Sequence, residues 1–464
     1  MGDAVATLES RRGYRCSQLV IAAMSRAIEC LWQTRVSLQA VSMNKPSVRA
    51  RCVSSVSSLF AVALATVTAS SNVCAQDAGV AAARTTPTIA AIDPAELEAI
   101  RPLLARGPVI VPRAVDQHAN SRPTIYVRVQ APLAVAHRVV RSPDEYRQFV
   151  PALGSVELQG RTGRRTAFRF HATAAIFDVS ADVRVNVVND RRVDVDITRS
   201  DFGPAGSRWE FFPESATSTV VALTVWCDPA QATWAIRQFA NSSAYSASSA
   251  NITAETVLAL AVKRRAEILA GARLPIRPAQ GTNHSPQLAG PAFGAWTSVL
   301  RSGLDVVSIE LDAQGAMRSL SVGRYVSSPE DIVRRRLMEA QYWNQYWLWL
   351  QNVRILQQTN ERVRISTTLG TPLAPGSGEV EARLDASRQT VWIEGRTGDF
   401  TRDRQRWDFQ AAPGGGTFVM YTGHSDEAHA AWFHRILMDR DVWAVAGLSG
   451  YWKVVMIRYG MWAL

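Results

Sequence analysis

The feature that most constrains the fold of this chain is a phrase that it contains twice. Residues 201–211 read DFGPAGSRWEF and residues 399–409 read DFTRDRQRWDF, so the same aspartate, arginine, tryptophan, acid and phenylalanine recur 198 positions later. Upstream the offset becomes 197, and the change falls in a segment with the composition of a turn, where an inserted residue is tolerated. The 464 residues therefore contain two copies of one domain, each of about 140 to 150 residues.

Both copies show the same order of local signals. Apolar residues alternate with polar ones, which predicts antiparallel strands; in the first copy these are centred on residues 125–129, 168–170, 183–187, 193–197, 209–212 and 220–226. Pro132 and Pro329 stand at equivalent places and predict the starts of short helices. The helical pattern of residues 255–262 predicts a long helix that closes the first copy, and the second copy ends in the same way from residue 427 onward.

Three stretches of the first copy share a further pattern. They are VQAPLAVAHRVVRSPDEYRQFVPAL at 129–153, SRWEFFP at 207–213 and TSTVVALTVWCDP at 217–229. With their counterparts in the second copy, they resemble the START-like, or SRPBCC, superfamily, which includes polyketide cyclases, lipid-transfer domains and coenzyme Q-binding proteins. The resemblance implies an α+β fold with two tandem helix-grip domains, each a curved antiparallel sheet wrapped around a long C-terminal helix. It implies an apolar cavity between sheet and helix, but no shared catalytic motif.

The front of the chain has the pattern of a targeting segment. A basic stretch from Lys45 to Arg51 precedes a short apolar run, and Ala75 supplies the small residue that a signal peptidase requires. We therefore expect translation to start at Met43, cleavage after Ala75, and a periplasmic or secreted protein. Of the five cysteines only Cys227 follows the cut, so no internal disulfide is expected in the mature protein.

The expected domain boundaries follow from the repeat and from composition. They are an upstream extension at 1–42, a signal peptide at 43–75, an N-terminal linker at 76–120, a first START-like domain at 121–271, a Pro/Gly-rich linker at 272–294 and a second START-like domain at 295–464. The two domains are expected to contact each other within the chain.

The charged residues of the repeated phrase are candidate ligand contacts. If Asp201 pairs with Arg208 across a hairpin, then Arg199 faces Glu210, and all four share the face of Val193. Such a cluster would bind a polar head group at one end of the cavity; the alternative is a set of cross-strand ion pairs at the rim of the sheet. With the matching residues of the second copy and three aromatic residues, the candidate ligand-binding residues are Phe168, Phe170, Arg199, Asp201, Arg208, Glu210, Trp392, Asp399, Arg406 and Asp408.

Tryptophan is concentrated in the second copy. The same parity places Trp209 and Trp407 on the face opposite the valines, where packing against a loop or the sister domain is expected. From residue 318 onward the chain holds nine of its fourteen tryptophans. These aromatic side chains either stack on a flat or polyprenyl ligand or fill the second cavity and leave a copy that binds nothing.

Motifs for catalysis, phosphate binding and cofactors are absent from the sequence, so no cofactor or metal is expected. His171 is a candidate general base in a cyclase-like pocket, and a solvent-facing strand position is the alternative for it. The net charge of +11 comes from interspersed residues, whereas a nucleic-acid surface needs clustered Lys and Arg, so no nucleic-acid partner is expected.

The function expected from these patterns is binding, or transfer, of a hydrophobic small molecule such as a lipid, quinone or polyketide by an exported protein. A transient contact with a membrane surface is a further expectation for the aromatic and basic stretch 451–459, and the alternative for this stretch is the core face of a helix packed on its sheet. Two alternatives remain open, a polyketide cyclase or aromatase that uses the same cavity and a structural module whose cavities are filled.

Overall fold

The computed structural model describes the part of the chain that follows residue 88. The described residues are 89–114, 121–151, 153–174, 177–228, 231–233, 237, 246–274, 293–311, 317–343, 350–369, 376–385, 387, 390–401, 403–424 and 454. No helix in these ranges is both long enough and apolar enough to cross a membrane. The expected signal peptide lies outside the described residues.

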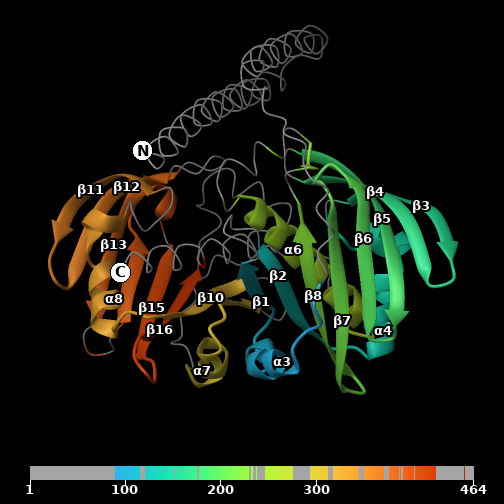
Figure 1. The fold of residues 1–464 in the computed structure, drawn as a ribbon. Helices are drawn as coiled ribbons and strands as arrows, with labels where there is room; N and C mark the ends of the chain where they lie inside the picture. The colour runs from blue at the N-terminus through green and yellow to red at the C-terminus, as the bar shows by residue number, and fades with distance from the viewer. Residues whose placement is uncertain are drawn as a thin grey trace, which may run out of the picture. The chain divides into compact units, whose positions relative to one another are not determined.

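The strands of the described part form one antiparallel sheet of sixteen strands (Figure 1). In the first repeat they are β1 (Val109–Ala114), β2 (Ser121–Val129), β3 (Leu153–Thr162), β4 (Arg165–Ala174), β5 (Phe177–Asn189), β6 (Arg192–Ser200), β7 (Ala205–Ser215) and β8 (Ser218–Cys227). In the second they are β9 (Val306–Leu311), β10 (Met317–Val326), β11 (Leu350–Gln358), β12 (Arg362–Leu369), β13 (Gly376–Asp385), β14 (Thr390–Gly395), β15 (Arg404–Ala411) and β16 (Thr417–His424).

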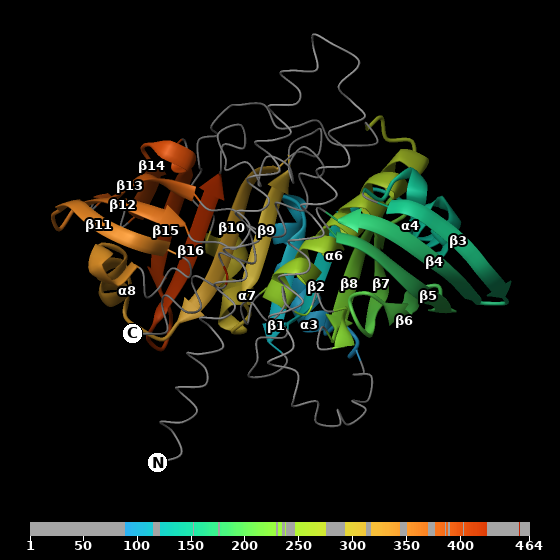
Figure 2. The same cartoon turned by 90° about the horizontal axis from the view of Figure 1, so that it is seen from above.

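The strand order confirms the predicted repeat. It runs β1-β2-β8-β7-β6-β5-β4-β3 in the first copy and β9-β10-β16-β15-β14-β13-β12-β11 in the second, so each strand has a counterpart at the same place. β1 and β9 join the copies as an antiparallel pair, in which Val109 lies opposite Ser308 and Ile110 opposite Val307 (Figure 2). The strands centred on the predicted alternating segments are all present.

Helices follow the same repeat. They are α3 (Pro94–Ile100), η2 (Leu103–Ala105), α4 (Leu133–Arg141), η3 (Pro143–Gln148) and α6 (Ser246–Leu269) in the first copy, and α7 (Phe293–Arg301), α8 (Glu330–Leu337), η5 (Ala340–Tyr342) and η6 (Gly398–Phe400) in the second. Pro132 and Pro329 are the N-cap residues of α4 and α8, one position before the helical place predicted for them.

The first repeat starts earlier than its expected boundary at residue 121. Helix α3 and strand β1 lie in the segment 76–120, for which the sequence predicts a linker, and they correspond to α7 and β9 of the second repeat. Pro112 lies in β1 directly opposite Pro123 of β2. A proline within a strand weakens the sequence signal for that strand, which is why β1 escaped prediction.

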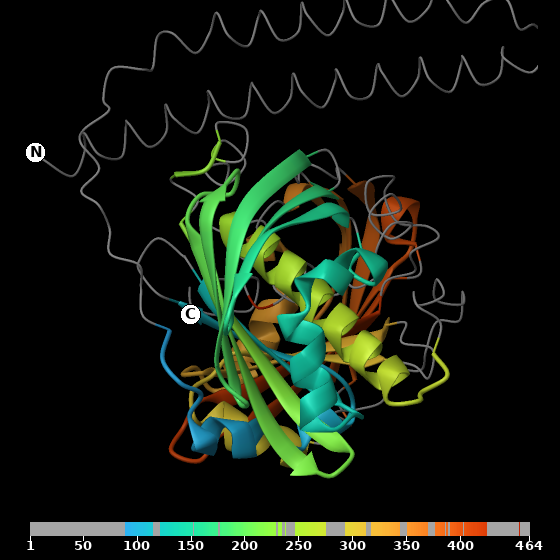
Figure 3. The ribbon, with the colours of Figure 1, turned by 90° about the vertical axis from the view of Figure 1, so that its right-hand side faces the viewer.

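The inner face of the sheet, which is the face toward α6, holds the main hydrophobic core. Helix α6 crosses the curved sheet of the first repeat with α4 beside it (Figure 3). The apolar side chains of Val127, Val193 and Leu223 meet Ala259 and Val262 of α6 in this core. The predicted helix 255–262 is therefore the central part of the helix that the sheet grips, and the helix-grip architecture is confirmed for the first repeat.

The second repeat has the same sheet and the same short helix α8, whose Val333 is buried in the inner core. The helix expected from residue 427 onward lies outside the described residues, with the exception of Val454. Val454 is helical, and only 1% of its surface is exposed in the same core. This position fits the core-facing alternative for the final stretch of the chain.

The outer face of the sheet, opposite α6, is covered over its central strands by α3 and α7. Trp296 and Leu300 of α7 join Ile100 of α3 in a second core, which draws on both repeats. Glu96 of α3 accepts hydrogen bonds from the Arg113 guanidinium and the Tyr126 hydroxyl, which ties α3 to β1 and β2. Burial and the neighbouring Glu96 raise the pKa of Tyr126 well above its usual value, so its hydroxyl stays a donor.

Candidate functional site

The aspartates of the repeated phrase bind the backbone of a neighbouring strand. Asp201 Oδ2 accepts hydrogen bonds from the backbone N of Ser180 at 2.7 Å and from its Oγ at 3.0 Å. Asp399 Oδ2 accepts a hydrogen bond from the backbone N of Ser377 at 2.9 Å. Ser180 and Ser377 are equivalent residues of β5 and β13. Both aspartates therefore hold the turn after β6 or β14 against the sheet, which is a structural role.

The predicted faces of the remaining charged residues are wrong. Arg208 lies opposite Asp194 rather than Asp201, and Val193 lies opposite Trp209. The observed register differs from the expected one by an odd number of residues, and an odd shift moves every side chain to the other face of the sheet. Arg208 and Glu210 consequently lie on the outer face, away from the valines and from α6.

Arg199 reaches the outer face for a different reason. β5 and β6 change register between Asp182 and Val183, which lie opposite Arg199 and Ile197 respectively. The extra residue, Thr198, forms a bulge that turns Arg199 away from the face of Ile197. Arg199 is exposed, and its charge helps to lower the pKa of Asp182, after the larger effect of the Arg169 hydrogen bond.

Arg208 and Glu210 anchor the segment that precedes α3. The Arg208 guanidinium donates to the backbone oxygen of Ile89 and, from Nε, to Asp194 Oδ1 at 3.0 Å. Glu210 Oε2 accepts a hydrogen bond from the backbone N of Ile92 at 3.2 Å. The pKa of Glu210 is raised by burial, although this backbone bond opposes the shift. Of the alternatives for this cluster, the structure therefore supports ion pairing on the sheet rather than a head-group site inside the grip.

Trp209 and Trp407 lie on the inner face, not on the opposite face as expected. Each is 1% exposed, between Val193 and Leu223 in the first repeat and between Val391 and Tyr421 in the second. The rings of Trp407 and Tyr421 meet edge to face with centroids 5.1 Å apart. The tryptophan of the repeated phrase is thus a core residue in both copies, because the register shift that moves the arginine outward moves it inward.

The outer face of the second repeat carries a network of charged side chains. Glu381 is 2% exposed and accepts hydrogen bonds from Arg362 Nη2 at 2.6 Å, from Arg396 Nη2 at 2.8 Å and from Arg383 Nε. Burial acts to raise the pKa of Glu381, but the three arginines lower it to about 2. This carboxylate is therefore ionised at neutral pH.

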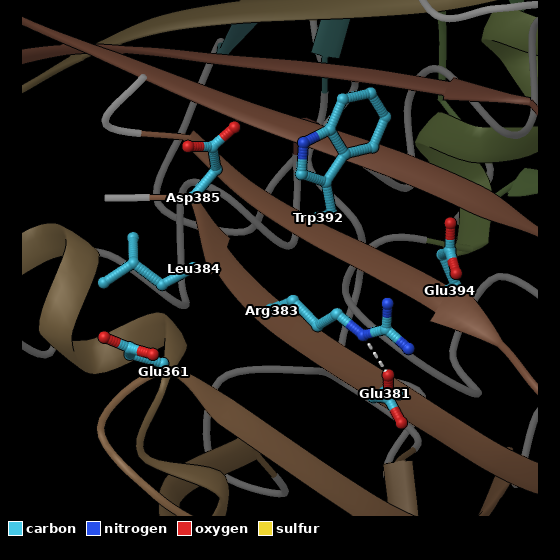
Figure 4. A pocket seen from close by; sticks show the side chains of 7 residues that line it. All are labelled: Glu361, Glu381, Arg383, Leu384, Asp385, Trp392 and Glu394. Carbon is cyan, nitrogen blue, oxygen red and sulfur yellow. Dashed lines mark hydrogen bonds and ion pairs between the residues drawn. The ribbon is translucent and has the colours of Figure 1, made fainter. Parts of the chain in front are cut away.

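A hollow of about 440 Å³ lies beside this network (Figure 4). It is lined by Glu361, Glu381, Arg383, Leu384, Asp385, Trp392 and Glu394. The Arg406 guanidinium carbon lies 5.3 Å from the centroid of the Trp392 ring, and Arg406 Nη2 pairs with Asp408 Oδ1 at 2.8 Å. These contacts bring three predicted site residues together. The lining is mostly carboxylates, which does not suit an apolar guest.

A second hollow, of about 360 Å³, lies at the C-terminal end of α6. Its lining includes Lys263 and Glu267 of α6, which form an ion pair, and Lys263 Nζ also donates to the backbone oxygen of Arg128 at 2.9 Å. These contacts fasten the end of α6 to β2. Lys263 and Glu267, two of the charged residues that line this hollow, are therefore already engaged in holding the helix.

The apolar part of the candidate site is the inner face of β4 to β6. Phe168 of β4 is buried there, whereas Phe170, Val195 and Ile197 are only half-buried. Among the described elements, α6 packs closely against β2, β8 and α4, and less closely against the strands beyond them. Phe168 and Phe170 are thus the two predicted site residues that share the inner face with α6.

Two polar residues of α6 on the side toward the inner face of the sheet are not among the residues predicted from the sequence. Asn251 Nδ2 and Glu255 Oε2 of α6 are shielded from solvent, and neither atom has a hydrogen-bond partner within the described part of the chain. The two residues lie one turn apart, in register with Leu258 and Val262 on one stripe of the helix. The sequence does contain a sign of these two residues, because they are polar positions on an otherwise apolar stripe of the helix. The apolar run that follows Glu255 makes this sign hard to recognise.

His171 is exposed on the outer face of β4, because it alternates with Phe170 and lies opposite Ser180. The solvent-facing alternative for this histidine is confirmed. Within the described ranges, His, Cys, Asp and Glu do not gather into a group that could hold a metal ion. Gly414, Gly415 and Gly416 have positive φ and form the turn of the hairpin between β15 and β16, so this glycine run is not a phosphate loop.

No family model matches this chain, and no curated protein matches its sequence. Among solved structures, the di-domain ARO/CYC protein StfQ from the steffimycin biosynthetic pathway is 13% identical, with 73% of this chain and 99% of that chain covered and a TM-score of 0.24. The di-domain ARO/CYC protein BexL is 14% identical, with 73% and 98% covered and a TM-score of 0.26. A START superfamily protein from Mycobacterium smegmatis is 18% identical, with 32% and 97% covered and a TM-score of 0.26. At these TM-scores, the tandem helix-grip architecture rests on the strand order and on the packing of α6.

Proposed function

We propose that this protein binds a hydrophobic small molecule, such as a lipid, a quinone or a polyketide, on the inner face of its first repeat. The observation that carries the proposal is the half-buried apolar surface of Phe170, Val195 and Ile197 on the face of the sheet toward α6. A guest that covers these side chains gains about 25 cal/mol for each Å² of apolar surface removed from water.

The free edge of the inner face supports a route of entry. Leu158 of the edge strand β3 lies opposite Phe168 and is 52% exposed. Its counterpart in the second repeat, Ile355 of β11, lies opposite Ile365 and is 42% exposed. An apolar side chain at the open rim of each grip would meet a guest, or the membrane that supplies it, before the guest reaches the inner face.

The two repeats differ in how much of the inner face their own side chains fill. In the inner core of the second repeat, Tyr421 stands where the first repeat has Leu223, and Trp343 stands where it has Tyr146. These large side chains support the alternative in which the second repeat is filled. We therefore assign binding to the first repeat, whose strands β4 to β6 carry the half-buried surface.

A cyclase-like reaction has less support than binding. The candidate base His171 is exposed on the outer face of β4, and Arg199 is exposed on the outer face of β6. Neither side chain shares a face with α6, so neither would touch a guest of the inner face. The proposal is accordingly one of binding or transfer without a chemical step.

The test uses the full-length chain and a matched pair of variants. We would measure binding of the dye Nile red, and co-purifying lipid by native mass spectrometry, for the wild type, Phe170→Asp and Trp392→Ala. A charge on the inner face should lower dye affinity at least tenfold, whereas Trp392 on the outer face should have no effect. Equal affinities in all three proteins, or no dye binding and no co-purifying lipid in the wild type, would contradict the proposal.

We also propose that the chain is exported, on the basis of the basic and apolar pattern between Met43 and Ala75. Expression in a Gram-negative host, followed by N-terminal sequencing of protein from the periplasm and the medium, tests it. A mature chain that begins at Gln76 is expected. Intact protein that stays in the cytoplasm with its N-terminal segment uncut would oppose export.

A further inference from the structure

One face of α6 carries two polar side chains toward the inner core of the first repeat. Asn251 and Glu255 are four residues apart, so they lie one above the other on the helix. Ala259 and Val262 continue this stripe and are completely buried in the inner core. The stripe therefore points into the grip, and the two polar groups share the interior with apolar side chains.

One polar atom of each side chain has no hydrogen-bond partner among the residues that the structure describes. These atoms are Asn251 Nδ2 and Glu255 Oε2, and both are shielded from solvent. A buried polar atom left without a partner costs about 1–3 kcal/mol. Because the two residues are four positions apart on α6, their side chains are neighbours on one face of the helix, and one ligand oxygen placed between them could accept a hydrogen bond from each.

Two ionisable groups at this place, the Glu255 carboxyl and the Cys227 thiol, are uncharged near neutral pH. Burial raises the pKa of Glu255 to about 8, which keeps its carboxyl protonated and able to donate. Burial also raises the pKa of Cys227 at the end of β8 to about 12, with smaller contributions from the charges of Glu255 and Asp228. The surroundings of Asn251 and Glu255 therefore suit a neutral guest, because a charged one would lose its hydration without gaining an ion pair.

We propose that the Asn251 amide and the Glu255 carboxyl jointly donate hydrogen bonds to an uncharged acceptor oxygen, such as a ketone or quinone carbonyl, on the apolar molecule that occupies the inner face. This inference rests on the proposed function, and it narrows the guest from any hydrophobic molecule to one that carries such an oxygen. A carbonyl oxygen has two lone pairs and can accept both bonds at once. Specificity would arise because a hydrocarbon of the same shape leaves both donors unpaired.

The experiment compares three probes with one ring skeleton, in the full-length protein at pH 6.5. Fluorene lacks a polar group, 9-fluorenone adds a carbonyl, and 9-aminofluorene adds an amine that is protonated at this pH. Isothermal titration should show that the wild type binds 9-fluorenone about tenfold more tightly than fluorene. Equal binding of these two probes would overturn the inference and leave the proposed function standing, whereas binding of none of the three would contradict the proposed function.

Variants assign the preference to the two residues. Glu255→Leu and Asn251→Ala should each reduce the preference for 9-fluorenone about threefold or more and leave fluorene affinity unchanged. Glu255→Gln keeps a donor and should retain most of the preference. Arg199→Ala, on the outer face, is the control and should behave as the wild type.

A preference for 9-aminofluorene that Glu255→Gln abolishes would mean that Glu255 acts as a carboxylate for a cation, and this result would also overturn the inference. Circular dichroism and thermal melting of every variant separate a loss of preference from a loss of folded protein. If Glu255→Leu does not fold, it is replaced by Glu255→Met, whose apolar side chain is about as long as that of glutamate.

Discussion

Asp201 accepts two hydrogen bonds from Ser180, at 2.7 Å from the backbone N and at 3.0 Å from Oγ, and this pair explains why the repeated phrase begins with aspartate. The bonds fasten the turn after β6 to the neighbouring strand β5. In the second repeat Asp399 makes the equivalent bond to the backbone N of Ser377. The first residue of the phrase therefore fixes a turn in both copies.

Replacing Asp201 should destabilise the protein more than replacing its counterpart. Asp201→Ala removes two bonds from a partly buried site and should lower the free energy of unfolding by about 2 kcal/mol. Asp399→Ala removes one bond at an exposed site and should cost about 1 kcal/mol or less. Urea denaturation measures both, with the exposed Asp196→Ala as the control. Equal losses in Asp201→Ala and Asp196→Ala would contradict the role assigned to Asp201.

Two tryptophans of the second repeat, one buried on the inner face and one on the outer face, should differ in their contribution to stability. Trp407 is almost fully buried on the inner face, so Trp407→Ala should lower the free energy of unfolding by about 3–5 kcal/mol. Trp392 lies on the outer face beneath Arg406, and Trp392→Ala should cost about 1 kcal/mol or less. Chemical denaturation of both variants checks this order. If Trp392→Ala proved the more damaging change, the assignment of the two faces would be wrong.

Sequence patterning predicted the strands and the gripped helix but not the faces. Alternation is a local property, so it identified β6 and β7 correctly. The face of Arg208 depends on the register between these strands, which the turn sets, and the face of Arg199 depends on a bulge at Thr198. Neither the register nor the bulge can be recognised from the alternation within one strand. An error of one residue in the register moves a side chain from the core to the surface.

Only the apolar residues of the candidate site could be predicted from the sequence. Phe168 and Phe170 follow from alternation on β4, and the structure places both on the inner face. Glu255 could not be assigned in this way, because a glutamate directly before an apolar run is ordinarily a solvent-exposed residue. Its unusual position depends on which stripe of α6 the sheet grips, which is a property of tertiary packing.

Glu255 should make stability depend on pH. The folded chain retains the carboxyl proton up to a pH of about 8, whereas the unfolded chain releases it near 4.5. The folded state then binds more protons than the unfolded state, so this group lowers the free energy of unfolding as pH rises, by at most about 1.4 kcal/mol per unit between these values. The loss is absent below the unfolded pKa and complete above the folded one.

The variant Glu255→Gln lacks this titration. The difference in unfolding free energy between Glu255→Gln and the wild type should therefore grow in favour of the variant from pH 5 to pH 8, as measured by urea denaturation. Glu157→Gln, an exposed position on β3, should show no such trend. A constant difference across this pH range for Glu255→Gln would show that its carboxyl is ionised in the folded protein.

Glu381 should give the opposite dependence on pH. The three arginines around it lower its pKa to about 2, so the folded state binds fewer protons than the unfolded state between pH 2 and 4.5. Its contribution to stability is present above pH 4.5 and is lost as pH falls toward 2. Glu381→Gln should be about 2 kcal/mol less stable than the wild type at pH 7, since it leaves three guanidinium groups without their shared carboxylate.

The difference in unfolding free energy between Glu381→Gln and the wild type should become smaller in acid. Glu361→Gln serves as the matched control, because Glu361 lines the same hollow but is exposed. Urea denaturation at pH 7 and pH 3 should show that the deficit of Glu381→Gln shrinks at the lower pH while that of Glu361→Gln stays near zero. A deficit of Glu381→Gln that is unchanged at pH 3 would mean that shape, rather than charge, sets its effect.

The β1–β9 pair should make the two repeats unfold together. Ile110 lies opposite Val307 in this pair, and the second core joins Ile100 of α3 to Trp296 and Leu300 of α7. Separation of the repeats would expose this core and an unpaired strand edge, so neither repeat gains by unfolding alone. Differential scanning calorimetry of residues 76–464 should give one transition, with a calorimetric enthalpy equal to the van't Hoff enthalpy. Trp296→Ala should lower the temperature of this transition without dividing it, whereas two resolved transitions in the unmodified chain would show that the strand pair and the shared core do not couple the repeats.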